Sequence, residues 1–227
     1  MKVLAIDTSG DACSAALYLD GVIEQRLELA PRRHAELILP MMQSLLTSAG
    51  IALGALDAIA FGCGPGSFTG VRIAVAVAQG AAFGAGRPTA PVSTLAALAQ
   101  GEFRRTGCRR ALVALDARMG EVYWGAYEIG AHAIMWRDGE ELVAAPGAVP
   151  VPAGDGWCGV GPGWAAHRET LAQRIGAGLL AVSPQPLCEA RDVALIAARA
   201  GRLVAAELAR PVYLREQVTH PAARPRV

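Results

Sequence analysis

The sequence predicts an α/β protein built from two similar lobes. Two observations support this prediction: a meander of apolar strands followed by helix, strand and helix opens the chain, and a second strand-rich meander begins near residue 104. Of the 227 residues, 53% are hydrophobic, which at this length is enough to bury a sizeable core. We expect one lobe over residues 1–103 and a smaller one over 104–227, with a helix near 189–208 packing back on the first.

The first lobe begins with three expected strands joined by tight turns. Residues 3–7 are apolar, residues 13–20 alternate between apolar and polar, and residues 22–30 resume the alternation. Asp20-Gly21 between the last two strands is typical of a two-residue hairpin. The start of the chain is therefore an antiparallel meander.

A helix is expected over residues 33–49, where apolar side chains recur at helical spacing and Gly50 provides a stop. Pro40 lies inside this range, so the helix either starts near Leu37 or kinks. The rest of the lobe reads as strand, helix, strand and helix, at residues 55–63, 67–84, 88–92 and from about 94. This order of elements is that of ribonuclease H.

The second half of the chain repeats the strand-rich unit. Strands are expected at 111–116, 121–129, 131–143 and 157–160, and helices at 164–176 and 189–208. From His220 onward the Pro- and Arg-containing sequence is typical of a loose tail.

Charge and cysteine content favour a cytoplasmic protein that does not wrap nucleic acid unaided. The formal net charge is only +1, and 18% of residues are charged. The five cysteines are odd in number and contain no CxxC pair, so we expect reduced thiols. The N-terminus MKVLAIDTSG reaches an aspartate too early for a signal peptide.

Two turns are candidates for holding phosphates. In "AIDTSG" an aspartate ends a strand and hydroxyl groups follow, while "GCGPGSFTG" is a glycine loop that leads into a helix. The alternatives are a plain turn, and glycines needed only for packing. The loop lacks the lysine of a Walker A motif. The candidate residues of such a vestigial nucleotide site are Asp7, Thr8, Ser9, Gly64, Gly66 and Ser67.

Catalytic and metal sites have little support. The four histidines form no HxxxH or HExxH motif, and His34 is expected to be a cap or a surface residue. No GxSxG elbow is present. Asp116, Arg118 and Glu121 sit at a turn, where an ion-paired structural role is favoured over a catalytic carboxylate pair. We therefore expect no catalytic residue and no metal ligand.

Four stretches, "AIDTS", "GPGSFTGVRIAVAVAQG", "DARMGEVYW" and "PVYLR", resemble the TsaB family, also called YeaZ, in this order along nearly the whole chain. The resemblance implies two ribonuclease-H-like lobes of the actin and sugar-kinase (ASKHA) type, and a role in making threonylcarbamoyladenosine beside the anticodon of tRNA. It also implies a catalytic paralogue, TsaD, whose metal is held by an HxxxH motif, and a small ATPase, TsaE. Thr94 and Leu98 stand here where that paralogue has its histidines, and neither is a ligand for iron or zinc.

We interpret the chain as a non-catalytic subunit that pairs with the TsaD-like paralogue, with a homodimer possible when it is alone. The alternative is an ATP-binding enzyme that acts through Asp7 and the glycine turns; a glycoprotease is the weakest reading. No cofactor is expected to bind tightly, although ATP or ADP with magnesium remains open within the complex. Contact with tRNA is expected only within the complex, through arginines at positions 104, 105, 109, 110, 215, 224 and 226.

Two helices rich in small or adaptable side chains are the expected partner surface. Its candidate residues are Leu37, Ile38, Met41, Met42, Leu45, Val71, Ala74, Val75, Ala78 and Ala82.

Overall fold

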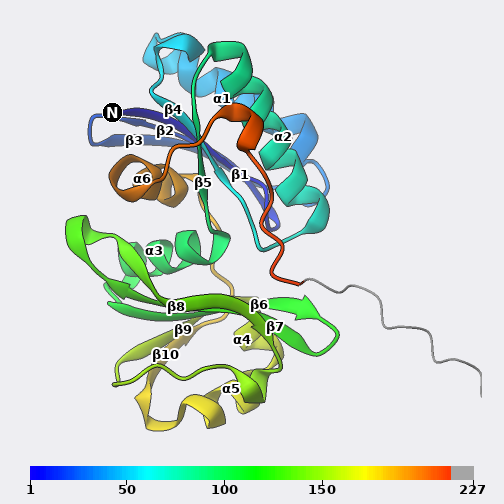
Figure 1. Ribbon diagram of the computed structural model, residues 1–227, viewed down its shortest axis with the longest axis vertical. Helices are drawn as coiled ribbons and strands as arrows, with labels where there is room; N and C mark the ends of the chain where they lie inside the picture. The colour runs from blue at the N-terminus through cyan, green and yellow to red at the C-terminus, as the bar shows by residue number, and fades with distance from the viewer. Residues whose placement is uncertain (216–227) are drawn as a thin grey trace, which may run out of the picture.

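The computed structural model describes residues 1–215. It consists of two five-stranded sheets, with helices between the sheets and on the outer face of each (Figure 1). The first sheet has the order β3-β2-β1-β4-β5. Its strands are β1 (Lys2–Asp7), β2 (Ala12–Leu19), β3 (Val22–Leu29), β4 (Ala58–Gly62) and β5 (Thr89–Val92). The first three strands are antiparallel, and β4 and β5 run parallel to β1.

The second sheet repeats this arrangement, with the order β8-β7-β6-β9-β10. Its strands are β6 (Arg110–Arg118), β7 (Glu121–Ile129), β8 (Met135–Ala144), β9 (Trp157–Val160) and β10 (Leu179–Ser183). Again three antiparallel strands are followed by two parallel ones. The matching strand orders confirm two lobes of the ribonuclease H type.

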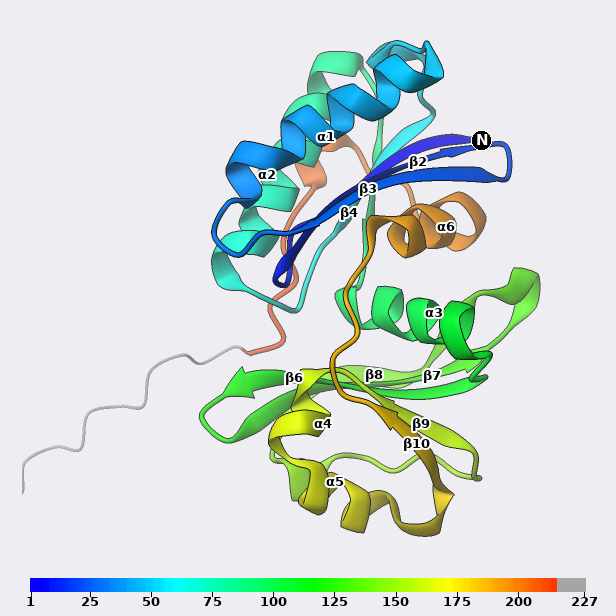
Figure 2. The same ribbon diagram turned by 180° about the vertical axis from the view of Figure 1, so that it is seen from behind.

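Within residues 1–215, six α-helices form layers around the two sheets (Figures 1 and 2). They are α1 (His34–Ala49), α2 (Phe68–Ala85), α3 (Thr94–Thr106), α4 (Pro162–Ala166), α5 (Arg168–Ile175) and α6 (Ala190–Ala200). Helices α1 and α2 cover the outer face of the first sheet, and α4 and α5 cover the outer face of the second. Between the sheets lie α6, which packs against β1 and β2, and α3, which packs against the second sheet.

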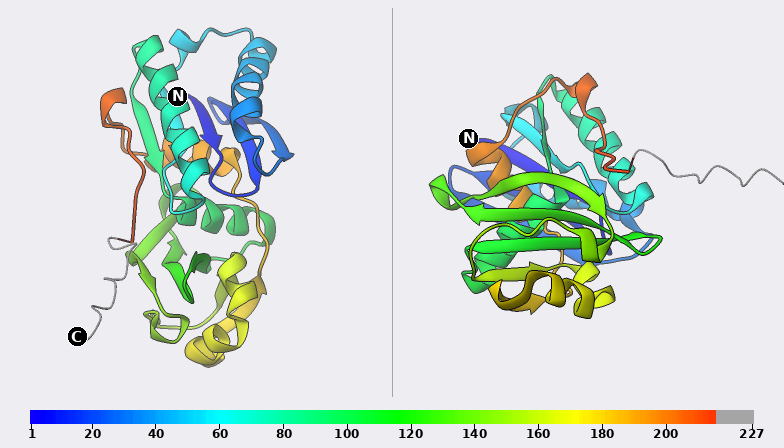
Figure 3. Two further views of the ribbon diagram at one scale, coloured as in Figure 1. Left: turned by 90° about the vertical axis from the view of Figure 1, so that its right-hand side faces the viewer. Right: turned by 60° about the horizontal axis from the view of Figure 1, so that its bottom comes forward.

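The segment after α6 returns along the first lobe (Figure 3). Val204 bridges to Thr89 of β5, the backbone N–H of Val212 donates to the carbonyl of Cys63 (2.8 Å), and Arg215 reaches the second lobe. Residues 190–215 thus pack mainly with the first lobe, although they follow the second in the chain. The tail from His220 lies outside the described residues.

Two expected helices differ from the structure, and one strand is additional. The predicted helix over 164–176 is divided into α4 and α5, because His167 leaves helical geometry at φ −130°. The predicted helix over 189–208 ends at Ala200, and the chain is extended from Gly201. Strand β10 was not predicted; its sequence, LLAVS, is short and half exposed, so it has no alternating pattern.

Pro40 neither starts nor breaks α1, which runs unbroken through it. The proline deprives only the carbonyl of Glu36 of its helical partner, and both residues are exposed, so water can satisfy that carbonyl.

The expectation of five reduced thiols is wrong for two of them. Cys108 and Cys158 form a disulfide with a Cα–Cα distance of 6.5 Å, although 50 residues separate them in the sequence. Cys13, Cys63 and Cys188 are free and buried. Spacing along the chain did not reveal the pair because the fold, and not a motif, brings the end of α3 beside β9.

Within residues 1–215, α2 is the helix whose length and composition would suffice to cross a membrane. In the structure its residues Val71, Ala74, Val75, Ala78 and Ala82 are buried in the core beside β4, and its other side is exposed. The apolar character of α2 therefore divides between a core face and an outer face.

Candidate functional site

The two turns proposed as a vestigial nucleotide site lie directly against each other. The N–H of Ser67 donates to the carbonyl of Ser9 (2.8 Å), and the hydroxyl of Thr8 donates to the carbonyl of Gly70 (2.7 Å). Ser67 caps α2 by accepting from the N–H of Gly70 (3.3 Å). The structure thus brings the predicted residues together, but through contacts between the turns themselves.

The glycines of the loop are required by this close packing. A Cβ at Gly66 would lie 2.6 Å from the carbonyl oxygen of Ser9, and one at Gly70 would overlap the carbonyl of Thr8. Gly64 has a φ of +100°, where other residues are strained, and its place beside Val212 leaves a Cβ only 3.0 Å from that carbonyl. The packing role of the glycines, left open from the sequence, accounts for these positions.

Asp7 is sealed within the protein and does not face a cleft. Its side chain is fully buried and accepts from the N–H (3.1 Å) and the hydroxyl (2.9 Å) of Ser9. Burial raises the pKa of Asp7 from 3.8 to about 6, against the lowering effect of the bonds from Ser9 and Cys188. In this conformation the carboxylate has no exposed oxygen to offer hydrated magnesium.

The raised pKa of Asp7 predicts a pH-dependent stability. Between about pH 4 and pH 6 the folded state binds a proton that the unfolded state has lost, so the free energy of unfolding falls as pH rises and then levels off. The difference amounts to about 3 kcal/mol at about 1.4 kcal/mol per pKa unit. We expect Asp7→Asn to remove this dependence, measured by urea unfolding at pH 4.5 and pH 7. A variant as pH-dependent as the wild type would assign the effect to other groups.

The positions that correspond to the paralogue's histidines are buried at the start of α3. Thr94 and Leu98 are each 2% exposed, and the N–H of Thr94 donates to the carbonyl of Gly64 (3.0 Å). Among residues 1–215, no group of three or more His, Cys, Asp or Glu side chains is placed to hold a metal ion. Helix α3, which carries both positions, packs here as part of the core.

The turn between β6 and β7 has the ion-paired role favoured from the sequence. Asp116 accepts from the N–H of Arg118 (2.8 Å) and pairs with its guanidinium (3.3 Å). Glu121 pairs with Arg215 (2.6 Å), which joins the returning segment to this turn. His34, in contrast, is not a surface residue: it is 7% exposed.

The residues expected to form a partner surface lie on the sheet-facing side of α1 and α2. Eight of them are buried against the first sheet: Ile38, Met42, Leu45, Val71, Ala74, Val75, Ala78 and Ala82. Leu37 and Met41 are partly buried against the same core. This assignment is therefore corrected, because side chains that cover the sheet are not available to another protein; of these ten residues, only Met42 also borders the groove between the two helices.

The outer side of these helices is an apolar groove that the sequence did not reveal. It has a volume of about 950 Å³ and lies between α1 and α2. Its lining comprises Leu39, Pro40, Met42, Gln43, Leu46, Ile51, Ala52, Leu53, Ala76, Val77, Gly80 and Ala81. We call this lining the α1–α2 groove. Apolar exposure continues at Phe68 (70%) and Phe83 (67%) near the two ends of α2.

Small residues keep the α1–α2 groove open. A Cβ at Gly80 or at Gly84 would meet no atom within 4 Å, so neither glycine is required by packing inside the chain. A helix bordered by small residues allows the backbone of another helix to approach closely. An apolar surface of this kind on a protein usually marks an interaction site.

Most of the arginines expected to contact tRNA are engaged inside the chain. Arg104 pairs with Glu189 (2.7 Å) and Asp192 (2.9 Å), and Arg105 pairs with Glu102 (3.3 Å). Arg110 pairs with Glu128 (3.2 Å) and Arg215 with Glu121 (2.6 Å), whereas Arg109 is exposed. Arg224 and Arg226 lie outside the described residues. The expected basic patch is thus largely neutralised by carboxylates.

Comparison with known proteins supplies an independent line of evidence. A family model described as "TsaD: tRNA N6-adenosine threonylcarbamoyltransferase" matches residues 26–226. A protein of Escherichia coli K12 named "tRNA threonylcarbamoyladenosine biosynthesis protein TsaB" is 44% identical, over 96% of each chain. A protein of the same name from Haemophilus influenzae is 36% identical, over 96% of this chain and 95% of that one. The solved structure of YeaZ from Pseudomonas aeruginosa superposes with a TM-score of 0.86 at 46% identity, covering 94% of this chain and 99% of that one.

Proposed function

Because the chain belongs to the TsaB (YeaZ) family, within the wider family that the TsaD model describes, we propose that it takes part in the biosynthesis of threonylcarbamoyladenosine in tRNA. Its proposed role is that of a non-catalytic subunit that pairs with a TsaD-like paralogue in the cytoplasm. The observation that carries this role is the contrast between the sealed turns and the open α1–α2 groove. The turns leave Asp7 fully buried, whereas the groove exposes apolar surface on two helices.

The groove suits a helical partner of related structure. Its lining is mostly aliphatic, includes the small residues Ala76, Gly80 and Ala81, and contains no Asp, Glu, Lys or Arg. A paralogue of the same fold would present its own pair of sheet-covering helices, so helices of the two subunits would pack against each other. A second copy of this chain would offer the same surface, and it is therefore the competing occupant when the paralogue is absent.

The deciding experiment is reconstitution with the TsaD-like paralogue. We expect the two chains to co-purify, and we expect formation of threonylcarbamoyladenosine to require both, together with a TsaE-like ATPase. Modification by the other components at an unchanged rate without this chain would refute the proposal. The nucleotide-enzyme alternative predicts magnesium-dependent ATP binding and turnover by the isolated chain, and titration with ATP tests that. ATP or ADP with magnesium bound within the complex stays a prediction.

The isolated chain should bind tRNA only weakly. A net charge of +1, together with arginines already paired to carboxylates, leaves few cations to displace the counterions of RNA. We expect a Kd in the non-specific range, about 10⁻⁴–10⁻⁶ M at physiological salt. Filter binding with unmodified tRNA measures this value, and a nanomolar Kd for the lone chain would contradict the charge distribution described above.

A further inference from the structure

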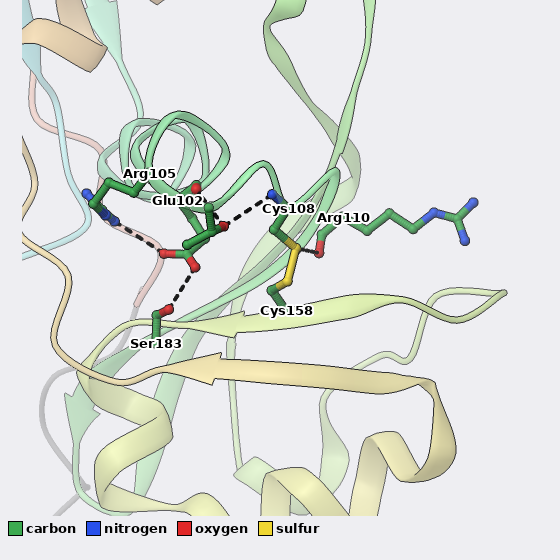
Figure 4. The surroundings of a disulfide bond; sticks show 7 residues. Glu102, Arg105, Cys108, Arg110, Cys158 and Ser183 are labelled. Atoms are coloured by element: carbon green, nitrogen blue, oxygen red, sulfur yellow. Dashed lines mark hydrogen bonds and ion pairs between the residues drawn. A yellow bond between two sulfur atoms is a disulfide. The ribbon is translucent and has the colours of Figure 1, made fainter.

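The disulfide between Cys108 and Cys158 joins the layer between the lobes to the second sheet (Figure 4). Gly107 ends α3 with a φ of +76°, and Cys108 follows it immediately. Cys158 lies in β9, where it pairs with Ala111 of β6. The bond therefore fixes the C-terminal end of α3 to β9, next to the central strand of the sheet on which that helix packs.

Other contacts hold the two cysteines close together without the S–S bond. The carboxylate of Glu102 is 3% exposed, accepts from the hydroxyl of Ser183 (2.7 Å) and pairs with Arg105 (3.3 Å). The hydroxyl of Thr106 donates to the carbonyl of Glu102 (2.9 Å) and accepts from the N–H of Cys108 (3.2 Å). The bond from Ser183 of β10 and the packing of α3 on the second sheet therefore hold the end of α3 over that sheet, while the local contacts of Glu102 and Thr106 order the turn that carries Cys108.

The reduced form also has a partner in place. The Sγ of Cys108 lies 3.3 Å from the carbonyl oxygen of Arg110, which a thiol proton can reach. A thiol at this position therefore keeps a hydrogen bond that the disulfide sulfur cannot make. The surroundings accommodate the dithiol and the disulfide alike.

We propose that Cys108 and Cys158 form a reversible redox site that ties α3 covalently to the second sheet when oxidised. The oxidant is a low-molecular-weight disulfide such as oxidised glutathione. The thiolate of Cys108, the more exposed of the pair, attacks one sulfur of the oxidant, and a mixed disulfide forms as one glutathione thiolate leaves. The thiolate of Cys158 then attacks the Sγ of Cys108 and releases the second. Two protein thiols lose two electrons and two protons, and one oxidised glutathione becomes two thiols.

The consequence of oxidation is a stiffer connection between the lobes. Helix α3 packs against α6, which covers the inner face of the first sheet, so a helix bonded to the second sheet restricts movement of both layers. Helices α1 and α2, which line the groove, lie on the opposite face of the first sheet (Figure 2). Pairing through that groove should therefore be the same in both redox states, and the redox site stands or falls independently of the proposed function.

Thiol counting on the full chain in glutathione buffers tests the site. Thiols are blocked by alkylation of the unfolded protein, and peptides are mapped by mass spectrometry. Under oxidising buffer we expect three alkylated cysteines, Cys13, Cys63 and Cys188, and one cross-linked peptide pair containing Cys108 and Cys158; under reducing buffer we expect five. Five alkylated cysteines in every buffer would show that the pair does not oxidise. A cross-link that persists in the most reducing buffer would show a permanent bond and not a reversible site.

A second experiment tests whether the effects of oxidation come from the Cys108–Cys158 bond. The oxidised wild type should melt about 10 °C above the reduced form, since closing a 50-residue loop restricts the unfolded chain. Amide hydrogen exchange in α3 should slow on oxidation. Cys108→Ser and Cys158→Ser should each abolish both differences, whereas Cys13→Ala, at a free buried cysteine, should retain them. Redox-dependent exchange in α3 that survives Cys158→Ser would overturn the assignment.

Discussion

Ala76→Glu should weaken pairing with the TsaD-like paralogue by about a hundredfold or more while the chain remains folded. Ala76 is exposed on α2 and lines the α1–α2 groove, so the glutamate side chain is solvated in the free subunit. In the complex the same carboxylate would be buried in an apolar contact without a partner. An uncompensated buried charge costs about 3–5 kcal/mol, and each 1.4 kcal/mol is tenfold in affinity. Titration by calorimetry or surface binding measures the loss.

Matched variants separate the outer face of α2 from its inner face. Ala78→Glu introduces the same change two residues away, where the side chain is fully buried against the first sheet, and should lower the melting temperature sharply. Ala165→Glu, at an exposed alanine of α4 in the second lobe, should change neither stability nor pairing. Leu39→Glu on the α1 side of the groove should behave like Ala76→Glu. If both groove variants are folded and pair with wild-type affinity, the groove is not the interface.

The order of elements could be predicted because each depends on local sequence. The strand over residues 13–20 and the Asp20-Gly21 turn are read from neighbouring residues, and both occur in the structure, although β2 is buried on both faces. The strand order of the first lobe follows from this succession, and the second lobe repeats it. Strand β10 lacked a comparable signal.

The faces of the helices could not be predicted because α2 is apolar or small almost all round. Ala74 and Ala78 face the sheet while Ala76 and Gly80 face outward, and a single polar residue among positions 74–80, Gln79, is too little to distinguish the two sides. The two sides of α2 differ too little in hydrophobicity to show which is buried, and only the sheet that covers one of them decides this. Sequence periodicity therefore identified the helix and misplaced its partner surface.

Contacts between residues far apart in the sequence could not be predicted either. The partners of Arg104 lie 85 and 88 residues away on the segment that leads into α6, so a run of arginines looked like a basic patch. Cys108 and Cys158 are likewise joined by the return of β9 beside β6. Such pairs depend on tertiary topology, which the motifs of either residue do not encode.

Arg104 should contribute about 3 kcal/mol to the free energy of unfolding. Its guanidinium donates to both oxygens of Asp192 (2.9 Å each) and to Glu189, joining α3 to α6 between the sheets. The Asp192 side chain is 1% exposed, and burial raises its pKa even though Arg104 lowers it. Breaking a buried pair by removing one partner costs about 3–5 kcal/mol; the lower end applies because 28% of the Arg104 side chain is exposed.

Arg104→Met should therefore lower the melting temperature by about 6–12 °C at pH 7, at about 2–4 °C per kcal/mol for a chain of this size. The loss should shrink at acidic pH, because an unpaired buried carboxyl has a raised pKa in the folded state, and its protonation on lowering the pH removes the buried charge. The double variant Arg104→Met with Asp192→Leu should recover most of the loss, since it leaves no charge unpaired. Arg33→Ala, at an ion pair whose side chains are 55% and 46% exposed, should cost at most about 1 kcal/mol. A loss of stability for Arg104→Met that is as small as that for Arg33→Ala, and that does not change with pH, would contradict this prediction. It would show that water already screens Asp192, and that apolar packing of α3 on α6 alone holds the two lobes together.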